Sequence, residues 1–178
     1  MTIELDVVLV RGAPGAGKST LGRRLRKLLS AAAVVEVDEL RAMISQVDWT
    51  SRHHHDQALA GTFALVRGFL GAGLRPVFVV DTLSRSRLLH VRSWLVQAGL
   101  HHRILSLWVE PAVLRARLEQ RTSGFREWEP AAVLNSEVQD HRWPDEILLD
   151  AGALAPDELA ARALHYLAVD GDAAETAS

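Results

Sequence analysis

Short apolar runs alternate with longer amphipathic stretches along the whole chain. The apolar runs predict β-strands at residues 4–11, 34–37, 76–80, 103–109 and 146–149. The amphipathic stretches predict helices at residues 18–30, 39–46, 54–72, 86–98, 111–121, 131–141 and 156–168. Strands that are apolar on both faces and alternate with helices indicate a parallel sheet covered on both sides. The pattern therefore predicts an α/β protein, a three-layer α/β/α sandwich around a five-stranded parallel sheet.

The length of 178 residues suits a single domain, which we place at residues 1–170, followed by a frayed tail at 171–178. The chain has no cysteine, which excludes a disulfide framework and a thiolate metal site. No uncharged apolar stretch approaches the roughly 20 residues of a membrane helix, and the first residues do not resemble a signal peptide. We therefore expect a cytoplasmic protein with no membrane partner.

A glycine-rich segment between the first predicted strand and the first predicted helix matches the pattern G-x-x-x-x-G-K-[ST]. The glycines let backbone amides surround a β-phosphate, and the positive end of the following helix adds to that field. The lysine can reach the β- and γ-phosphates, and the serine hydroxyl can bind Mg²⁺. The candidate ATP-binding residues are Gly12, Ala13, Pro14, Gly15, Ala16, Gly17, Lys18, Ser19 and Thr20. The motif predicts a P-loop NTPase fold of the nucleotide-kinase type that binds ATP with Mg²⁺.

Asp38 and Asp81 each follow the end of a predicted strand. The carboxyl ends of parallel strands lie along one edge of a sheet, so both carboxylates should lie near the phosphates. Asp81 ends an apolar strand like a Walker B aspartate and is the second candidate metal ligand beside Ser19. Asp38 is then available as the general base for an acceptor hydroxyl. Either aspartate could also be a helix N-cap. Thr82, where motor ATPases carry a water-activating Glu, favours a transferase.

From Asp6 to Ala168, the chain resembles the P-loop kinases grouped with polynucleotide 5′-hydroxyl kinases, zeta toxins, and gluconate and chloramphenicol kinases. In the polynucleotide kinases, a D-x-x-R segment supplies the general base and an arginine that contacts the acceptor's phosphate. The resemblance implies these roles for Asp38 and Arg41. The segment beginning at Asp81, with Arg87 downstream, is similar to a second acceptor-side segment of the group. Arg41 and Arg87 are therefore candidate substrate-binding residues beside Asp38.

Arg117 and Arg121 lie four residues apart near the end of a predicted helix that leaves the fourth strand toward the nucleotide edge. In related kinases, such a pair in a lid clamps the transferring phosphate. The resemblance implies catalytic roles for Arg121 and Arg117 alongside Lys18, with Arg126 as a further candidate, in a lid around residues 117–130. The alternative is that these arginines are solvated helix-surface residues.

His53, His54 and His55 are consecutive and lie near the predicted acceptor side. Adjacent helical residues point about 100° apart, so the three histidines are poorly placed to share one metal ion. One of them, together with Trp49, could contact the acceptor, or the run could be a solvated helix start. Trp128, in the predicted lid loop, could contact the nucleotide base or serve in packing.

Together these features predict an ATP- and Mg²⁺-dependent kinase that phosphorylates a hydroxyl of a small molecule: a metabolite, a nucleoside or an antibiotic. A polynucleotide 5′-hydroxyl kinase is the alternative, although a net charge of −2 gives little attraction to a polyanion. A regulatory or toxin-like module that binds ATP and hydrolyses it slowly is an alternative of another class. The sequence does not distinguish the acceptor, ATP from GTP, or the oligomeric state.

Overall fold

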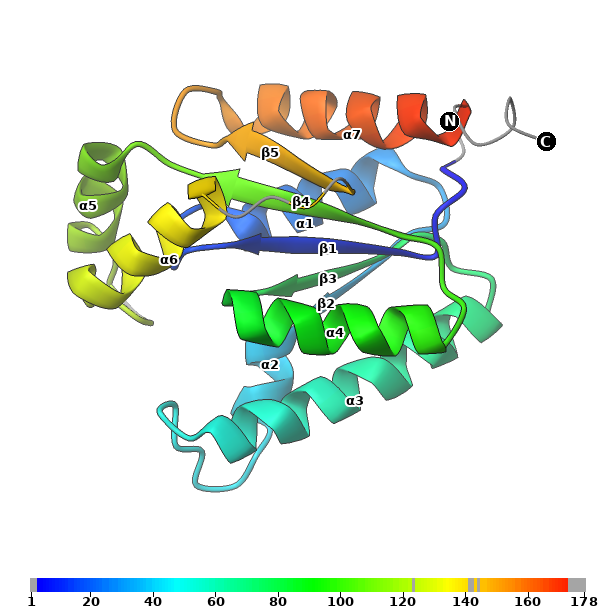
Figure 1. The fold of residues 1–178 in the computed structure, drawn as a ribbon, viewed down its shortest axis with the longest axis horizontal. Coiled ribbons are helices and arrows are strands. Elements are labelled where there is room, and N and C mark those ends of the chain that lie inside the picture. Colours follow the sequence, from blue (N-terminus) through cyan, green and yellow to red (C-terminus); the bar gives the residue numbers. More distant parts are fainter. Residues whose placement is uncertain (1–2, 123, 141–142, 144, 173–178) are drawn as a thin grey trace.

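A computed structural model of the protein describes residues 3–122, 124–140, 143 and 145–172 (Figure 1). Its five strands are β1 (Val7–Gly12), β2 (Ala33–Glu36), β3 (Val77–Asp81), β4 (His102–Trp108) and β5 (Glu146–Asp150). They form one parallel sheet in the order β2-β3-β1-β4-β5. The P-loop strand β1 is therefore central, with β3 and β4 as its neighbours. The predicted five-stranded parallel sheet is confirmed.

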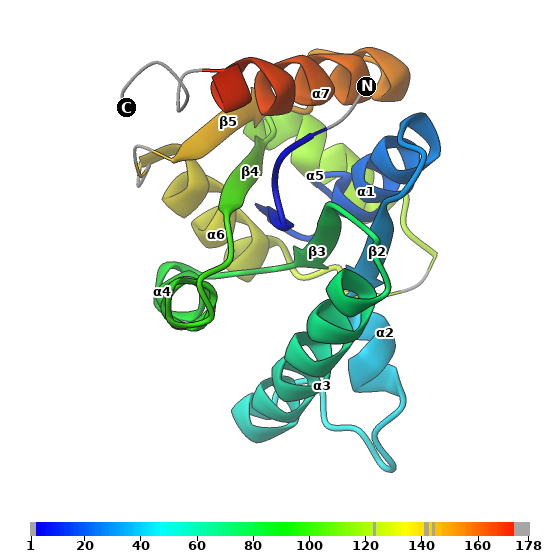
Figure 2. The same ribbon diagram turned by 90° about the vertical axis from the view of Figure 1, so that its right-hand side faces the viewer.

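Seven helices connect or follow these strands in the described part of the chain. They are α1 (Lys18–Leu28), α2 (Val37–Ala42), α3 (Arg52–Gly71), α4 (Arg85–Gln97), α5 (Pro111–Glu119), α6 (Trp128–Asp140) and α7 (Pro156–Asp172). Helices α1 and α7 cover one face of the sheet, and α3 and α4 lie on the other side (Figure 2). Helices α5 and α6 lie beyond the ends toward which β1 and β4 point (Figure 1). No helix in the described residues is long and apolar enough to cross a membrane.

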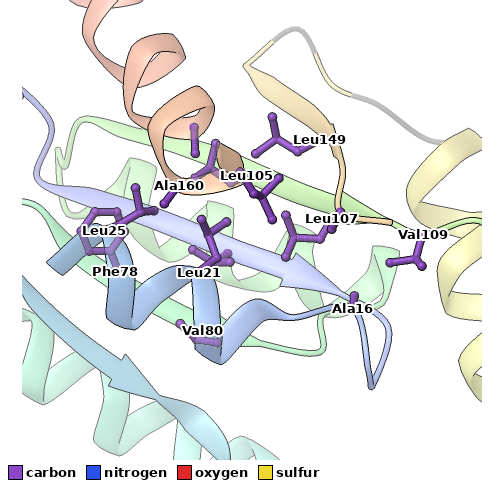
Figure 3. Packing of buried hydrophobic residues seen from close by; sticks show 14 of the residues in the cluster. Ala16, Leu21, Leu25, Phe78, Val80, Leu105, Leu107, Val109, Leu149 and Ala160 are labelled. Atoms are coloured by element: carbon purple, nitrogen blue, oxygen red, sulfur yellow. The ribbon is translucent and has the colours of Figure 1, made fainter. Parts of the chain in front are cut away.

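Two apolar clusters hold these layers together, one on each face of the sheet. Val8 and Val10 of β1 belong to the cluster under α1 and α7, which also contains Leu21 and Leu25 (Figure 3). Val7 and Leu9 belong to the cluster that includes residues of α3 and α4. Successive side chains of a strand point to opposite faces, so β1 contributes to both clusters. Because β1 is packed on both faces, the position of the loop that follows it is fixed.

Four predicted boundaries differ from the structure, and the first three differences affect the site. Strand β2 and helix α2 are continuous in the chain, so Asp38 lies inside the first turn of α2. Helix α5 ends at Glu119, so Arg121 follows the helix. Helix α6 begins at Trp128, which shortens the predicted 122–130 loop. Helix α7 extends into the predicted tail as far as Asp172; residues 173–178 lie outside the described residues.

Candidate active site

A cleft of about 1210 Å³ opens at the carboxyl edge of the sheet. Most residues singled out from the sequence line it: Pro14, Gly15, Ala16, Gly17, Lys18, Ser19, Thr20, Asp38, Arg41, Asp81, Arg87, Arg117 and Arg121. Trp49 and His55 line it as well. Gly12 and Ala13 are buried where β1 enters the loop. The fold thus brings phosphate-binding, acidic and basic side chains from five segments of the chain to one cavity.

Two glycines show why the loop needs its sequence. At Gly12 a Cβ atom would lie 2.8 Å from the carbonyl oxygen of Leu107 in β4, so a larger residue would separate β1 from its neighbour. Gly17, the N-cap of α1, has φ +96°, a left-handed conformation that residues with a Cβ adopt at a cost of about 1–2 kcal/mol. Together they let the loop turn sharply into the positive end of α1.

Lys18 extends along this loop, and its Nζ donates a hydrogen bond to the carbonyl oxygen of Ala13 at 3.1 Å. The pKa of Lys18 is lowered from 10.5 to about 8, chiefly by burial and to a smaller extent by the positive charge of Arg121. The nearby carboxylates of Asp81 and Asp38 oppose this effect because they favour the charged ammonium. The free protein thus stabilises the charged form of Lys18 only in part. A bound phosphate would stabilise it further.

Asp38 reaches the cleft from the first turn of α2. The N-cap of α2 is Glu36, so Asp38 is not the cap that one interpretation of the sequence allowed. Asp38 is exposed to the open cleft, and its pKa is raised, first by partial desolvation and second by the negative charge of Asp81; Lys18 partly offsets both. A carboxylate with a raised pKa is a stronger proton acceptor than an ordinary aspartate.

Asp81, the last residue of β3, is buried, and both of its carboxylate oxygens accept hydrogen bonds. Oδ1 accepts from the backbone N–H of Thr82 at 2.7 Å, and Oδ2 lies 2.9 Å from Nε2 of His55. The N-cap of α4 is Ser84, so Asp81 does not cap that helix. His55 is the one member of the histidine run that is buried, whereas His53 is exposed. No local pattern predicts this pair, because 26 residues separate its members.

Ser19 and Asp81 are the residues that suit Mg²⁺ at this cleft. No group of three or more His, Asp or Glu side chains in the described part of the chain could form a metal cage. Magnesium prefers oxygen ligands, keeps several waters, and binds through one or two protein groups together with substrate phosphates. One hydroxyl and one carboxylate beside a phosphate-binding loop therefore fit this ion.

Arg41 is buried and already has partners in this structure. Its Nη2 donates to the carbonyl oxygens of Asp48, Trp49 and Ser51 at 3.1, 2.7 and 3.0 Å. The guanidinium also lies over the Trp49 ring, with Cζ 5.1 Å from the ring centroid. Arg41 thus holds the loop between α2 and α3 through Nη2, whereas its buried Nε has no hydrogen-bond partner among the described residues. Its contact with an acceptor's phosphate stays a prediction. Arg87 also lines the cleft and is only partly buried.

The two arginines of the predicted lid differ in their surroundings. Arg117 donates from Nη2 to the carbonyl oxygen of Ala151 at 2.9 Å, which ties α5 to the segment after β5. Arg121 lines the cleft and packs against Gly124, where a Cβ would lie 2.8 Å from Nη2.

Two further lid candidates lie elsewhere. Arg126 is exposed and donates to the carbonyl oxygen of Arg121, and it is not part of the cleft lining. Trp128 begins α6 and packs under Arg115, with Cζ 5.3 Å from the ring centroid. The predicted contact of Trp128 with a nucleotide base is therefore not supported, and the packing interpretation fits.

Comparisons with known proteins agree with this architecture. A family model described as an AAA domain matches residues 7–144. No curated protein sequence matches the chain.

Among solved structures, the chain resembles a gluconokinase from Sinorhizobium meliloti 1021, with a TM-score of 0.69, 21% identity and 99% of each chain covered. It also resembles the Mycobacterium tuberculosis APS kinase in complex with AMPPNP and APS, with a TM-score of 0.67, 21% identity, and 93% of this chain and 99% of that chain covered. A tunicamycin resistance protein from Deinococcus radiodurans gives a TM-score of 0.69 at 17% identity over 92% of this chain and 96% of that one. At these identities the likeness establishes the fold.

Proposed function

The chain belongs to the AAA domain family, and from that premise we propose that it is an ATP- and Mg²⁺-dependent kinase acting on a hydroxyl of a small molecule. The observation that carries this proposal is the second carboxylate in the cleft. Asp81 suffices to bind the metal, whereas Asp38, with a raised pKa, is an additional acid beside the phosphate-binding lysine. A carboxylate repels phosphates unless it binds a cation or accepts a proton. ATP binding alone does not require Asp38. Transfer to an alcohol does, because a group must accept the proton of the alcohol.

In the proposed reaction the P-loop amides and Lys18 bind the β- and γ-phosphates. Ser19 and Asp81 would hold Mg²⁺, which would neutralise phosphate charge when bound. Asp38 accepts the proton of the acceptor hydroxyl as its oxygen attacks the γ-phosphorus, and ADP leaves as the bond to the β-phosphate oxygen breaks. Arg121 stabilises the charge on the transferring group, while Arg117 anchors α5. We propose that residues 117–130 act as a lid that excludes water and so limits hydrolysis.

A small-molecule acceptor is favoured over a polynucleotide by the state of Arg41. This arginine would contact the phosphate next to a 5′-hydroxyl, but its Nη2 already donates to three backbone carbonyls of the loop before α3. The gluconokinase and APS kinase likenesses support the same choice. A reaction that consumes ATP also supports a cytoplasmic location.

The proposal is tested by a phosphoryl-transfer screen with labelled ATP over sugars, nucleosides, antibiotics and 5′-hydroxyl oligonucleotides. We expect labelled product from one small-molecule class, and a loss of about 10²-fold or more in transfer rate for Asp38→Asn with ATP binding retained. Glu39→Gln, which removes an exposed acid from the same helix, is the matched control and should leave the rate unchanged. Full transfer by Asp38→Asn would contradict the mechanism. Labelled oligonucleotide would favour the polynucleotide alternative, and ATP hydrolysis without any product would favour the regulatory module.

A further inference from the structure

Asp81 is held by two hydrogen bonds that together fix the plane of its carboxylate. The Thr82 amide at 2.7 Å holds Oδ1 from within the same chain segment. His55 at 2.9 Å holds Oδ2 from a different element, the first turn of α3. His55 and Asp81 are each about 2% exposed at their side chains, so water does not compete for this bond. Each oxygen of a carboxylate can accept more than one bond, so Asp81 retains capacity for a further ligand.

The tautomer of His55 follows from its surroundings. Its Nδ1 is buried and has no hydrogen-bond partner among the described residues. A neutral imidazole has one N–H, and an ionised carboxylate can only accept. We therefore assign a proton to Nε2, from which it is donated to Asp81.

The start of α3 is itself firmly held, so His55 can act as a support. Ser51 is the N-cap of α3, and its Oγ accepts the backbone N–H of His54 at 3.3 Å. The carbonyl of Ser51 in turn accepts from Arg41. Arg41, in α2, thus braces the turn from which His55 reaches Asp81. The His55 contact thus links the start of α3, which Arg41 of α2 supports, to the carboxylate at the end of β3.

We propose that His55 is a positioning residue that holds the Asp81 carboxylate in the orientation required by the Mg²⁺ of the bound nucleotide. Groups that hydrogen-bond to metal ligands typically change metal affinity 10- to 100-fold when they are removed. This inference rests on the proposed function, because it assigns Mg²⁺ to Asp81. It adds a role for His55 that neither the P-loop motif nor the general base requires.

The test measures how strongly Mg²⁺ and ADP bind together. Calorimetry gives the Kd of ADP with saturating Mg²⁺ and with EDTA, and the ratio of the two is the coupling between metal and nucleotide. In His55→Gln the side-chain amide nitrogen can take the place of Nε2, so the ratio should stay within about 3-fold of the wild-type ratio. In His55→Asn the donor falls short, and the ratio should drop by about 10-fold or more. His53→Asn, at an exposed neighbouring position, is the matched control and should keep the wild-type ratio.

The outcomes separate this inference from the function on which it rests. If the wild-type ratio is large and Asp81→Asn abolishes it, while His55→Asn and His55→Gln both retain it, the inference about His55 is wrong and the proposed metal role stands. If the wild-type protein shows no coupling, both are overturned. Nitrogen-15 NMR of the wild-type protein with Mg²⁺ and ADP gives a check that does not depend on variant folding. It should show a proton on Nε2 of His55, and a ring protonated on Nδ1 alone would refute the inference.

Discussion

At the scale of single residues, burial and nearby carboxylates have opposing effects on the charge of Lys18 in the free protein. Burial makes its ammonium costly, and two carboxylates only partly compensate. A bound polyphosphate brings several negative charges to the same place and favours the charged form. Nucleotide binding should therefore be coupled to protonation of Lys18.

We predict that ADP binding at pH 8.5 takes up a substantial fraction of one proton. The pKa of Lys18 is about 8, so the group is mostly neutral in the free protein above that pH and becomes charged in the complex. Below about pH 7 the group is already protonated, and the uptake should vanish. Calorimetry in two buffers with different ionisation enthalpies measures the uptake directly.

Lys18→Met is the control for this measurement, because it removes the titrating group and should abolish the uptake at pH 8.5. Equal uptake by the wild type and Lys18→Met would assign the proton to another group and contradict the prediction.

The sequence allowed residues to be placed at the cleft where each lies directly after a predicted strand. The P-loop residues and the aspartates that follow two strands could be placed at one edge of the sheet from strand order and polarity alone, and they line one cleft. The bond from His55 to Asp81 and the engagement of Arg41 could not be anticipated. Both depend on how α2, α3 and the loop between them fold back over β3, which no spacing in the sequence expresses.

At the scale of elements, α5 links the P-loop to the predicted lid. Leu114 and Leu118 pack against the loop, and a Cβ at Gly15 would lie 3.3 Å from each of them. Arg117 fastens the same helix to the segment after β5. Arg121 lies just past the helix end, where the side chain faces the cleft. Anchoring and charge stabilisation are thus assigned to different arginines of one segment.

Substitution of Arg121 should therefore impair catalysis, whereas substitution of Arg117 should impair stability. Arg121→Ala should lower kcat by about 10³-fold, the contribution of an arginine on the transferring phosphate, with little change in Tm. Arg117→Ala should lower the free energy of unfolding by about 1–3 kcal/mol, because the Ala151 carbonyl loses a charged donor. Steady-state kinetics and thermal melts of both variants check this. A kinetic defect confined to Arg117→Ala would reverse the assignment.

At the scale of the whole molecule, three strands meet at a buried ion pair under the site. Arg11, fully buried at the end of β1, contacts Glu146 of β5 at 2.7 Å. Its Nε also donates to Ser106 of β4 at 2.9 Å, and its Nη1 donates to the carbonyl oxygen of Leu83 at 3.3 Å. These bonds join β1, β4, β5 and the segment after Asp81 in one network. The residue before the P-loop thus also supports the chain that follows Asp81, the aspartate that we propose binds Mg²⁺.

We predict that Arg11→Met lowers the free energy of unfolding by about 3–5 kcal/mol, because it leaves the Glu146 carboxylate buried without its cation. Replacing the pair together, as Arg11→Met with Glu146→Leu, should recover more than half of the loss. Chemical denaturation measures both. Asp56→Ala, which breaks the exposed pair with Arg52, is the control and should cost about 0.5 kcal/mol or less. A similar cost for Arg11→Met and Asp56→Ala would contradict the prediction.

The sequence could predict the sheet but not this network. An alternating pattern of strands and helices determines a parallel α/β fold because few topologies bury such strands. Arg11 is the last residue of the first predicted strand, and nothing near it in the sequence indicates a buried partner. Only its pairing with a glutamate 135 residues later shows that the strand remains buried there.

The strand order has a consequence for how the chain acquires its activity during synthesis. Strand β1 is made first, but its two neighbours are β3 and β4, and β2 does not touch it. A nascent chain that has emerged only as far as β2 therefore carries the whole phosphate-binding sequence without a strand to pair with β1. The loop acquires its fixed shape only after β3 and β4 have left the ribosome, so nucleotide capture should begin late in translation and then abruptly.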